Sequence, residues 1–361
     1  MANLPKRNMK KLLSIIVPSF NMEAYLSRCL DSLGLEDMSL QERLEIIVVN
    51  DGSKDGTSRI AHEYAERYPN AVRVIDKQNG HYGSCINAAL KAVSGEFVKL
   101  LDADDYFERE AFISFLARLV QMRDAGELDD VDLLVTPYAT VDDEGSHLRD
   151  VSYPYSQDRS ISVAEFQSSL SFHILHQAVA FRASIFREID YAQSEGCPYT
   201  DLEWVTYPMR KVRQVRYLPY SIYRYFIGRE GQTVSPEAFR KGVPSIIRLM
   251  RRMLGDYASL TASQTPGVKD YVDKVIGAQL GIVYRSFLLE KNPHIKLEDI
   301  LALDDAVRSA SSALMARSDL VLHSRHFDFH YVREFRRAGR RGTLKFFLYD
   351  AYVRLARLMS K

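Results

Sequence analysis

The sequence predicts an α/β fold with a mostly parallel sheet flanked by helices, followed by an all-helical C-terminal region. In the first 110 residues, short continuous apolar runs alternate with segments whose apolar residues recur every three or four positions. That alternation is typical of βαβ units. From Pro236 onward only the helical period remains. We therefore expect one domain over residues 1–234 and a helical region over residues 235–361.

Four buried strands are expected in the first half of that domain, residues 12–110. Each is a run of apolar, mostly β-branched residues bounded by turn-forming residues. They cover residues 12–17, 45–49, 72–75 and 97–101. The intervening segments predict helices, the first over about residues 22–33, the second ending before Pro69 and the third ending at Gly95.

The second half of the domain, residues 111–234, is less regular. The polar, Pro- and Ser-rich stretch 140–162 predicts a long loop. The remaining patterns predict helices over 110–122, 163–170 and 201–211, and strands over 131–135, 178–181, 215–218 and 222–226.

Composition narrows the class of protein. The 361 residues are 46% hydrophobic and 26% charged, which is ordinary for a globular chain. The net charge of +1 gives no basis for nucleic-acid binding. The three cysteines show no paired spacing, which favours buried thiols in a reducing compartment. The apolar run 12–17 is too short for a secretory signal, and no run reaches 18 apolar residues. We expect a cytoplasmic protein, with membrane contact limited to the periphery of the inner face.

Polar residues follow each of the four expected strands, at 18–21, 50–57, 79–84 and 102–105. Ligands of open α/β sheets bind beyond the carboxyl ends of the strands, so these four exits are candidate binding segments. The first three also fit simple turns and helix caps. The fourth places Asp102, Asp104 and Asp105 within four residues. Like charges at a strand end favour a divalent cation such as Mg²⁺ or Mn²⁺, the alternative being a solvated acidic turn.

Taken together in order and spacing, these segments resemble family 2 glycosyltransferases of the bacterial, non-processive type. The resemblance is carried by Ser14–Asn21, Ile47–Thr57, Asn87 with Gly95-Glu96, and Leu101–Asp105. It is close over residues 12–110 and looser to residue 234. It implies the GT-A fold with a mixed, mostly parallel sheet, a DxD motif, and inversion at the anomeric carbon of a nucleotide diphosphate sugar.

The resemblance also implies roles for individual residues. Pro18, Phe20 and Asp51 would surround the nucleobase, with Asp51 accepting a hydrogen bond from uracil. Asp104 would hold the Mn²⁺ or Mg²⁺ that bridges the diphosphate, and Asp102 would lie near the ribose or join Asp104 at the metal. The full set implied for the nucleotide sugar is Pro18, Ser19, Phe20, Asn21, Asp51, Gly80, His81, Asn87, Asp102, Ala103 and Asp104.

The catalytic base of the family is the Asp of a Glu-Asp pair, and Asp201 matches it here, with Thr200 in place of the Glu. A helix N-cap is the alternative role for Asp201. No Gln-x-x-Arg-Trp box surrounds Trp204, which favours transfer of a single sugar. Family members often have a loop at Arg229 that closes over the diphosphate, so this residue is a candidate phosphate contact, the alternative being a solvated loop. His173 and His176 are interpreted as structural histidines.

The resulting hypothesis is an inverting, metal-dependent glycosyltransferase. It would move one sugar, from a UDP-sugar donor, to a hydroxyl of a saccharide or lipid-linked acceptor, in cell-surface glycan or polysaccharide biosynthesis. A nucleotidyltransferase is an alternative, although residues 18–21 lack its Gly-rich loop with Arg and Lys. A non-catalytic scaffold is another, although all four acidic positions, Asp51, Asp102, Asp104 and Asp201, are present.

The C-terminal segment 333–361 is strongly basic. It holds nine Lys or Arg and two acidic residues, a net +7, while the rest of the chain is −6. On a helix, its charged residues Asp350, Arg354, Arg357 and Lys361 form one stripe, and Phe346, Leu348, Tyr352, Leu355 and Met359 cover much of the remaining surface. Contact with an anionic membrane and self-association through the C-terminal helices both fit this pattern.

Overall fold

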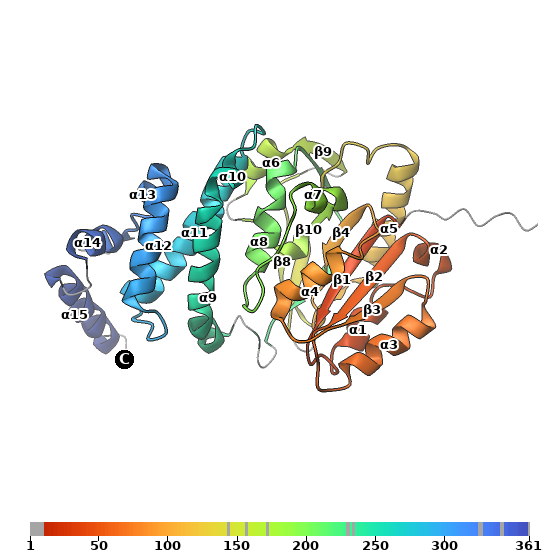
Figure 1. Cartoon of the computed structure of the whole chain (residues 1–361), viewed down its shortest axis with the longest axis horizontal. Coiled ribbons are helices and arrows are strands. Elements are labelled where there is room, and N and C mark those ends of the chain that lie inside the picture. Colours follow the sequence, from red (N-terminus) through yellow and green to blue (C-terminus); the bar gives the residue numbers. More distant parts are fainter. Residues whose placement is uncertain are drawn as a thin grey trace, which may run out of the picture. The chain divides into compact units, whose positions relative to one another are not determined.

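The computed structural model describes residues 11–142, 145–155, 158–170, 173–228, 232, 235–323, 328–339 and 343–359 (Figure 1). The chain divides into two compact units. Unit 1 comprises Met1–Ser235 and Leu260–Tyr271, and unit 2 comprises Pro236–Ser259 and Val272–Lys361. Unit 1 carries the eight-stranded and four-stranded sheets and all four acidic positions that the sequence singled out.

Unit 1 is built on an eight-stranded sheet in the order β3-β2-β1-β4-β10-β6-β11-β9. Its strands are β1 (Leu13–Ser19), β2 (Leu44–Asn50), β3 (Val72–Asp76), β4 (Phe97–Leu100), β6 (Leu133–Val135), β9 (Arg159–Ser162), β10 (Val179–Arg182) and β11 (Gln214–Tyr217). The first four pair in parallel, whereas β10 runs antiparallel to both β4 and β6. The predicted mixed, mostly parallel sheet is confirmed. Every residue of β1 and β2 is buried, which is why these strands appear as continuous apolar runs.

The helices of unit 1 follow the predicted alternation with the strands. They are α1 (Leu26–Asp31), α2 (Met38–Gln41), α3 (Thr57–Arg67), α4 (His81–Leu90), α5 (Arg109–Asp124), α6 (Val163–Ser169), α7 (Ala183–Glu188) and α8 (Asp201–Thr206), with short 3-10 turns η1 (His176–Ala178) and η2 (Pro208–Lys211). The helix predicted over 201–211 is wrong at its end, because Pro208 lacks the N–H that would continue α8.

A second sheet of four strands corrects the loop predicted over 140–162. Its order is β5-β12-β7-β8, with β5 (Tyr106–Phe107), β7 (Tyr138–Val141), β8 (His147–Val151) and β12 (Tyr223–Phe226). The edge strand β8 is almost entirely exposed and polar, so no apolar alternation marks it. This sheet fixes the acidic loop after β4, because Asp105 accepts hydrogen bonds from the Tyr223 hydroxyl (2.6 Å) and the Phe226 N–H (2.8 Å).

The C-terminal elements are helical with one exception. They are α9 (Pro236–Gly255), α10 (Tyr257–Thr261), α11 (Val268–Leu288), α12 (Leu297–Ala310), α13 (Ser312–Arg317), α14 (Tyr331–Ala338) and α15 (Leu344–Met359). The prediction of an all-helical region is wrong at the hairpin of β13 (Leu322–His323) and β14 (Asp328–Phe329), whose two-residue strands are too short to show a period. No helix among the described residues is long and apolar enough to span a bilayer.

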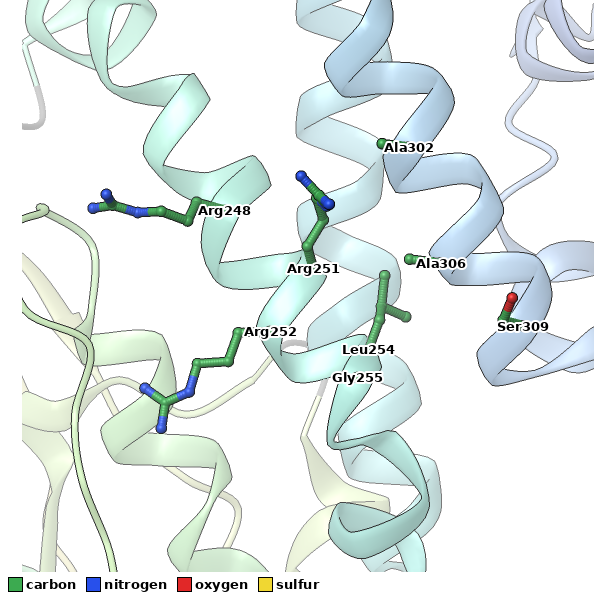
Figure 2. A pocket seen from close by; sticks show the side chains of 8 residues that line it. All are labelled: Arg248, Arg251, Arg252, Leu254, Gly255, Ala302, Ala306 and Ser309. Carbon is green, nitrogen blue, oxygen red and sulfur yellow. The ribbon is translucent and has the colours of Figure 1, made fainter.

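An open groove of about 440 Å³ lies between α9 and α12 within unit 2. Figure 2 shows Arg251 extending between the two helices, beside Ala302 and Ala306, while Arg248 and Arg252 point away from α12. The guanidinium groups diverge, so they do not converge on one point where a single anion would be held.

Candidate active site

A cavity of about 440 Å³ opens at the carboxyl edge of the main sheet, within unit 1. We call it the acidic pocket, because Asp102, Asp104 and Asp201 all line it. The segments after β1 and β4, the start of α4, the η1 turn, the start of α8 and strand β12 supply its walls. Six residues predicted from the sequence line it, namely Pro18, His81, Asp102, Ala103, Asp104 and Asp201.

His176 links two of the pocket carboxylates. Its Nε2 hydrogen-bonds Asp102 Oδ2 at 3.1 Å, and its Nδ1 lies 4.0 Å from Asp201 Oδ2. The Tyr82 hydroxyl donates to the other oxygen of Asp102, Oδ1, at 2.9 Å. Both oxygens of Asp102 are therefore engaged by side chains of the pocket itself.

The electrostatics of the pocket follow from this clustering. Burial disfavours the charged form of His176, but the carboxylates of Asp102 and Asp201 outweigh it and raise the pKa of the imidazole. Burial raises the pKa of Asp201, and the nearby Asp102 adds to the shift while His176 opposes it. A carboxyl group with a raised pKa is a better proton acceptor once ionised, which is what a general base requires.

Asp201 is the first residue of α8 and not its N-cap. The cap position belongs to Thr200, whose hydroxyl accepts from Gln193 Nε2 at 2.9 Å. The alternative capping role for Asp201 is therefore wrong. The neighbouring carboxylate, Glu203, is fully buried and accepts hydrogen bonds from the N–H and hydroxyl of Ser194 (2.6 and 2.8 Å). Of the two acids on this helix, only Asp201 lines the pocket.

Asp51 lies buried at the end of β2. Its Oδ1 accepts from Lys77 Nζ at 2.7 Å and from the Gly80 N–H at 3.0 Å. A Cβ on Gly80 would lie 2.6 Å from Ser84 Oγ, so the close approach of this loop to α4 requires glycine. Phe20, after β1, is exposed. Both of these hydrogen bonds go to Asp51 Oδ1, and the Cys85 thiol also hydrogen-bonds the Asp51 carboxylate.

Three residues of the predicted donor set make their side-chain contacts within the protein. Ser19 donates to the Val17 carbonyl at 3.2 Å. Asn21 accepts from the Lys54 N–H at 2.8 Å, and so holds the loop after β2. Asn87 bonds the backbone of Gln193 and the side chain of Glu195, so it fixes the loop before α8. The structure does not bring these three into the acidic pocket.

Several pocket residues were not indicated as functional by the sequence. Tyr82, Gln177, Tyr225 and Gln232 also line the cavity, and His176 was interpreted as structural. Only its place just before a buried strand marked His176 in the sequence. Arg229, the predicted diphosphate contact, lies outside the described residues.

A bound metal would need ligands from outside the protein. Among the described residues, no three or more His, Cys, Asp or Glu side chains are placed to hold a metal ion. With Asp102 engaged by Tyr82 and His176, the other carboxylate after β4 that lines the pocket is Asp104. Mg²⁺ and Mn²⁺ often use one or two carboxylates plus substrate phosphates and water, so the residues present fit an ion that arrives with its substrate.

A mixed sheet of this order, with a carboxylate loop at its carboxyl edge, defines the class as a GT-A glycosyltransferase fold. Residues 14–187 match the family model described as Glycosyl transferase family 2. This part of the chain is a family 2 glycosyltransferase domain.

Known relatives agree with that assignment. The chain is 38% identical over 118 residues to the uncharacterized glycosyltransferase EpsJ of Bacillus subtilis, covering 33% of this chain and 32% of EpsJ. It is 38% identical over 97 residues to the poly(ribitol-phosphate) beta-N-acetylglucosaminyltransferase TarS of Staphylococcus aureus, covering 27% of this chain and 17% of TarS. The matches thus span about a third or less of these relatives' lengths.

The fold is also seen in a solved structure. S. aureus TarS 1–349 in complex with UDP-GlcNAc aligns with a TM-score of 0.62 and 22% identity, over 85% of this chain and 83% of that one. The resemblance extends well beyond the segment matched by sequence.

Proposed function

We propose that this protein is an inverting, metal-dependent glycosyltransferase that moves one sugar from a UDP-sugar to a hydroxyl group of a saccharide or lipid-linked acceptor. The observation that carries the proposal is the meeting of Asp102, Asp104 and Asp201 around one cavity. Asp102 and Asp104 lie within residues 14–187, the segment that matches the family 2 model. The reaction would belong to cell-surface glycan synthesis, a proposal supported by relatives whose names refer to poly(ribitol-phosphate) and to teichoic acid biosynthesis.

The donor would enter with its base near Asp51 and its diphosphate in the acidic pocket. Lys77 and the Gly80 N–H hold Oδ1 of Asp51, which fixes the carboxylate, and its Oδ2 would accept a hydrogen bond from a ring N–H of uracil. The solved TarS complex with UDP-GlcNAc supports a uridine nucleotide. The exposed ring of Phe20 offers an apolar surface to the base.

The charge of the pocket argues for a cation. Three carboxylates line it, and none of its described lining residues is Lys or Arg. A diphosphate entering such a cavity would be repelled unless a divalent ion accompanied it. Asp104, with Asp102 beside it, would hold that Mn²⁺ or Mg²⁺. When bound, the ion supplies Lewis-acid stabilisation to the leaving diphosphate.

Asp201 would act on the acceptor. Its side chain is 38% exposed, on the pocket surface, where an acceptor hydroxyl can reach it. As the hydroxyl oxygen attacks the anomeric carbon, its proton passes to Asp201, and the bond to the diphosphate oxygen breaks on the opposite face. One displacement of this kind inverts the configuration.

Calorimetric titration, which measures donor binding directly, tests this proposal. UDP-GlcNAc and UDP are titrated into wild type, Asp104→Ala and the control Asp124→Ala, whose carboxylate lies exposed on α5. Each titration is run with Mn²⁺ and again in EDTA. We expect binding only with Mn²⁺, and only in wild type and Asp124→Ala. Equal binding in EDTA, or by Asp104→Ala, would contradict the metal assignment.

A further inference from the structure

The last helix, α15 (Figure 1), carries several large apolar side chains that are exposed. Phe347 is 69% exposed and Leu348 is 56% exposed, and Leu344 and Tyr352 are exposed as well. These four residues occupy positions i, i+3, i+4 and i+8 of one helix, so they share one side of it. We call this set the α15 apolar face. A run of large exposed apolar side chains on one helix side marks an interaction surface.

The opposite side of α15 is the one that packs within unit 2. Phe346 is only 1% exposed, and its ring lies 5.1 Å from that of Phe329. Tyr349 approaches the same ring at 5.7 Å, and Asp350 pairs with Lys291 at 2.9 Å. Of the apolar residues that the sequence placed beside the charged stripe, Phe346 is therefore buried, whereas Leu348 and Tyr352 are exposed. Because other residues hold the helix in place, the α15 apolar face is available for a partner.

Two basic side chains, Lys345 and Arg337, lie beside Leu348 at one edge of this face. Lys345 and Arg337 are both exposed, and both reach the single carboxylate of Glu334 (3.3 and 3.2 Å). Two cations against one anion leave a net positive charge at the edge of the face. The segment 333–361 as a whole is +7. The side chains of residues 354–361 lie outside the described residues, so their share of this charge is known from the sequence alone.

We infer that the α15 apolar face docks on an anionic lipid surface. Leu344, Phe347 and Leu348 would enter the headgroup boundary while the neighbouring cations meet the lipid phosphates. The charge argues against a second copy as occupant, because each copy would bring the same positive segment to a symmetric interface. An anionic membrane instead complements both the apolar and the basic character.

Vesicle flotation of the full-length protein tests this inference and needs no donor turnover. Wild type is floated with phosphatidylcholine vesicles and with vesicles that also contain phosphatidylglycerol, at low and at high salt. The variant Phe347→Asp/Leu348→Asp removes the centre of the face. The matched control is Leu148→Asp/Leu301→Asp, which alters leucines that are also exposed (54% and 42%). Thermal unfolding by circular dichroism checks that both variants fold.

We expect wild type and the control to bind anionic vesicles, with binding lost at high salt. The Phe347→Asp/Leu348→Asp variant should bind at least about tenfold more weakly. Equal binding by this folded variant, or equal binding to neutral vesicles, would overturn the inference. So would a wild-type dimer, seen by light scattering, that ignores vesicles and dissociates in the variant.

Discussion

Replacing Asp201 with Asn should lower the rate of sugar transfer while leaving donor binding nearly unchanged. The substitution keeps the size of the side chain and removes its ability to accept a proton. Asp201 does not cap α8, so the helix loses no cap. Asp51, at the end of β2, bonds Lys77 and Gly80 and has no contact with Asp201, so donor affinity should stay close to wild type.

The magnitude follows from the proposed role. A positioned general base is worth about 10²–10⁴ in rate. That corresponds to about 3–5 kcal/mol of transition-state stabilisation. The loss should appear in kcat, with the donor KM unchanged, because the interaction is made only in the transition state.

Although Asp201→Asn should lower kcat, it should not lower the free energy of unfolding. Burial raises the pKa of Asp201, so the native state holds this proton more tightly than the unfolded state does. The contribution of this group to the free energy of unfolding therefore falls as pH rises from its ordinary pKa through the raised one. Asp201→Asn lacks that penalty, and at pH 7 its free energy of unfolding should be no lower than that of wild type.

The assay is UDP release with and without acceptor, over a pH series, beside urea unfolding. Wild-type kcat should rise with pH through the raised pKa of Asp201. Glu203→Gln is the matched control on the same helix, and it should lose stability because Glu203 holds Ser194. An Asp201→Asn enzyme that transfers sugar at the wild-type rate would refute the assignment of the base.

Two further predictions concern buried groups. Asp51→Ala should weaken UDP binding by about 1–3 kcal/mol, since Lys77 and the ligand both lose a partner, and unchanged affinity in calorimetry would argue against a base contact. Lys99 is buried on β4, donates to the Gln177 carbonyl at 2.6 Å, and burial lowers its pKa to about 7. Because the unfolded state keeps that proton to higher pH, the wild-type free energy of unfolding should rise between pH 7 and about 9.5, by up to a few kcal/mol. Urea unfolding of Lys99→Met should lack this rise, and an identical rise would show that Lys99 is not its source.

Strands could be predicted from the sequence where every residue of the strand is buried. All seven residues of β1 and of β2 are buried, so their apolar runs and the polar exits after them could be read directly. The sheet β5-β12-β7-β8 could not, because β8 is exposed and β5 is two residues long. Neither strand presents the period on which a strand prediction depends.

In the same way, some residues of the acidic pocket could be predicted from the sequence and others could not. Asp102 and Asp104 were predicted because several like charges follow one buried strand, and Asp201 was predicted from the resemblance to family 2 glycosyltransferases; all three line the pocket. The sequence could not show that Asn21 and Asn87 hydrogen-bond loops of the protein. In a sequence, an asparagine that binds a ligand cannot be distinguished from one that holds a loop. His176 shows the converse, because its role depends on two partners, Asp102 and Asp201, that lie 74 and 25 positions away in the chain.

The place of His176 between Asp102 and Asp201 has a consequence for how the site can be dissected. The same imidazole hydrogen-bonds one carboxylate at 3.1 Å and lies 4.0 Å from the other, and both raise its pKa against the effect of burial. Asp102 is proposed to act on the donor and Asp201 on the acceptor. A substitution at Asp102 would nevertheless also change the electrostatic environment of Asp201. Effects at these two positions should therefore not add. Asp51, whose carboxylate bonds Lys77 and the Gly80 N–H instead, reports on the donor alone.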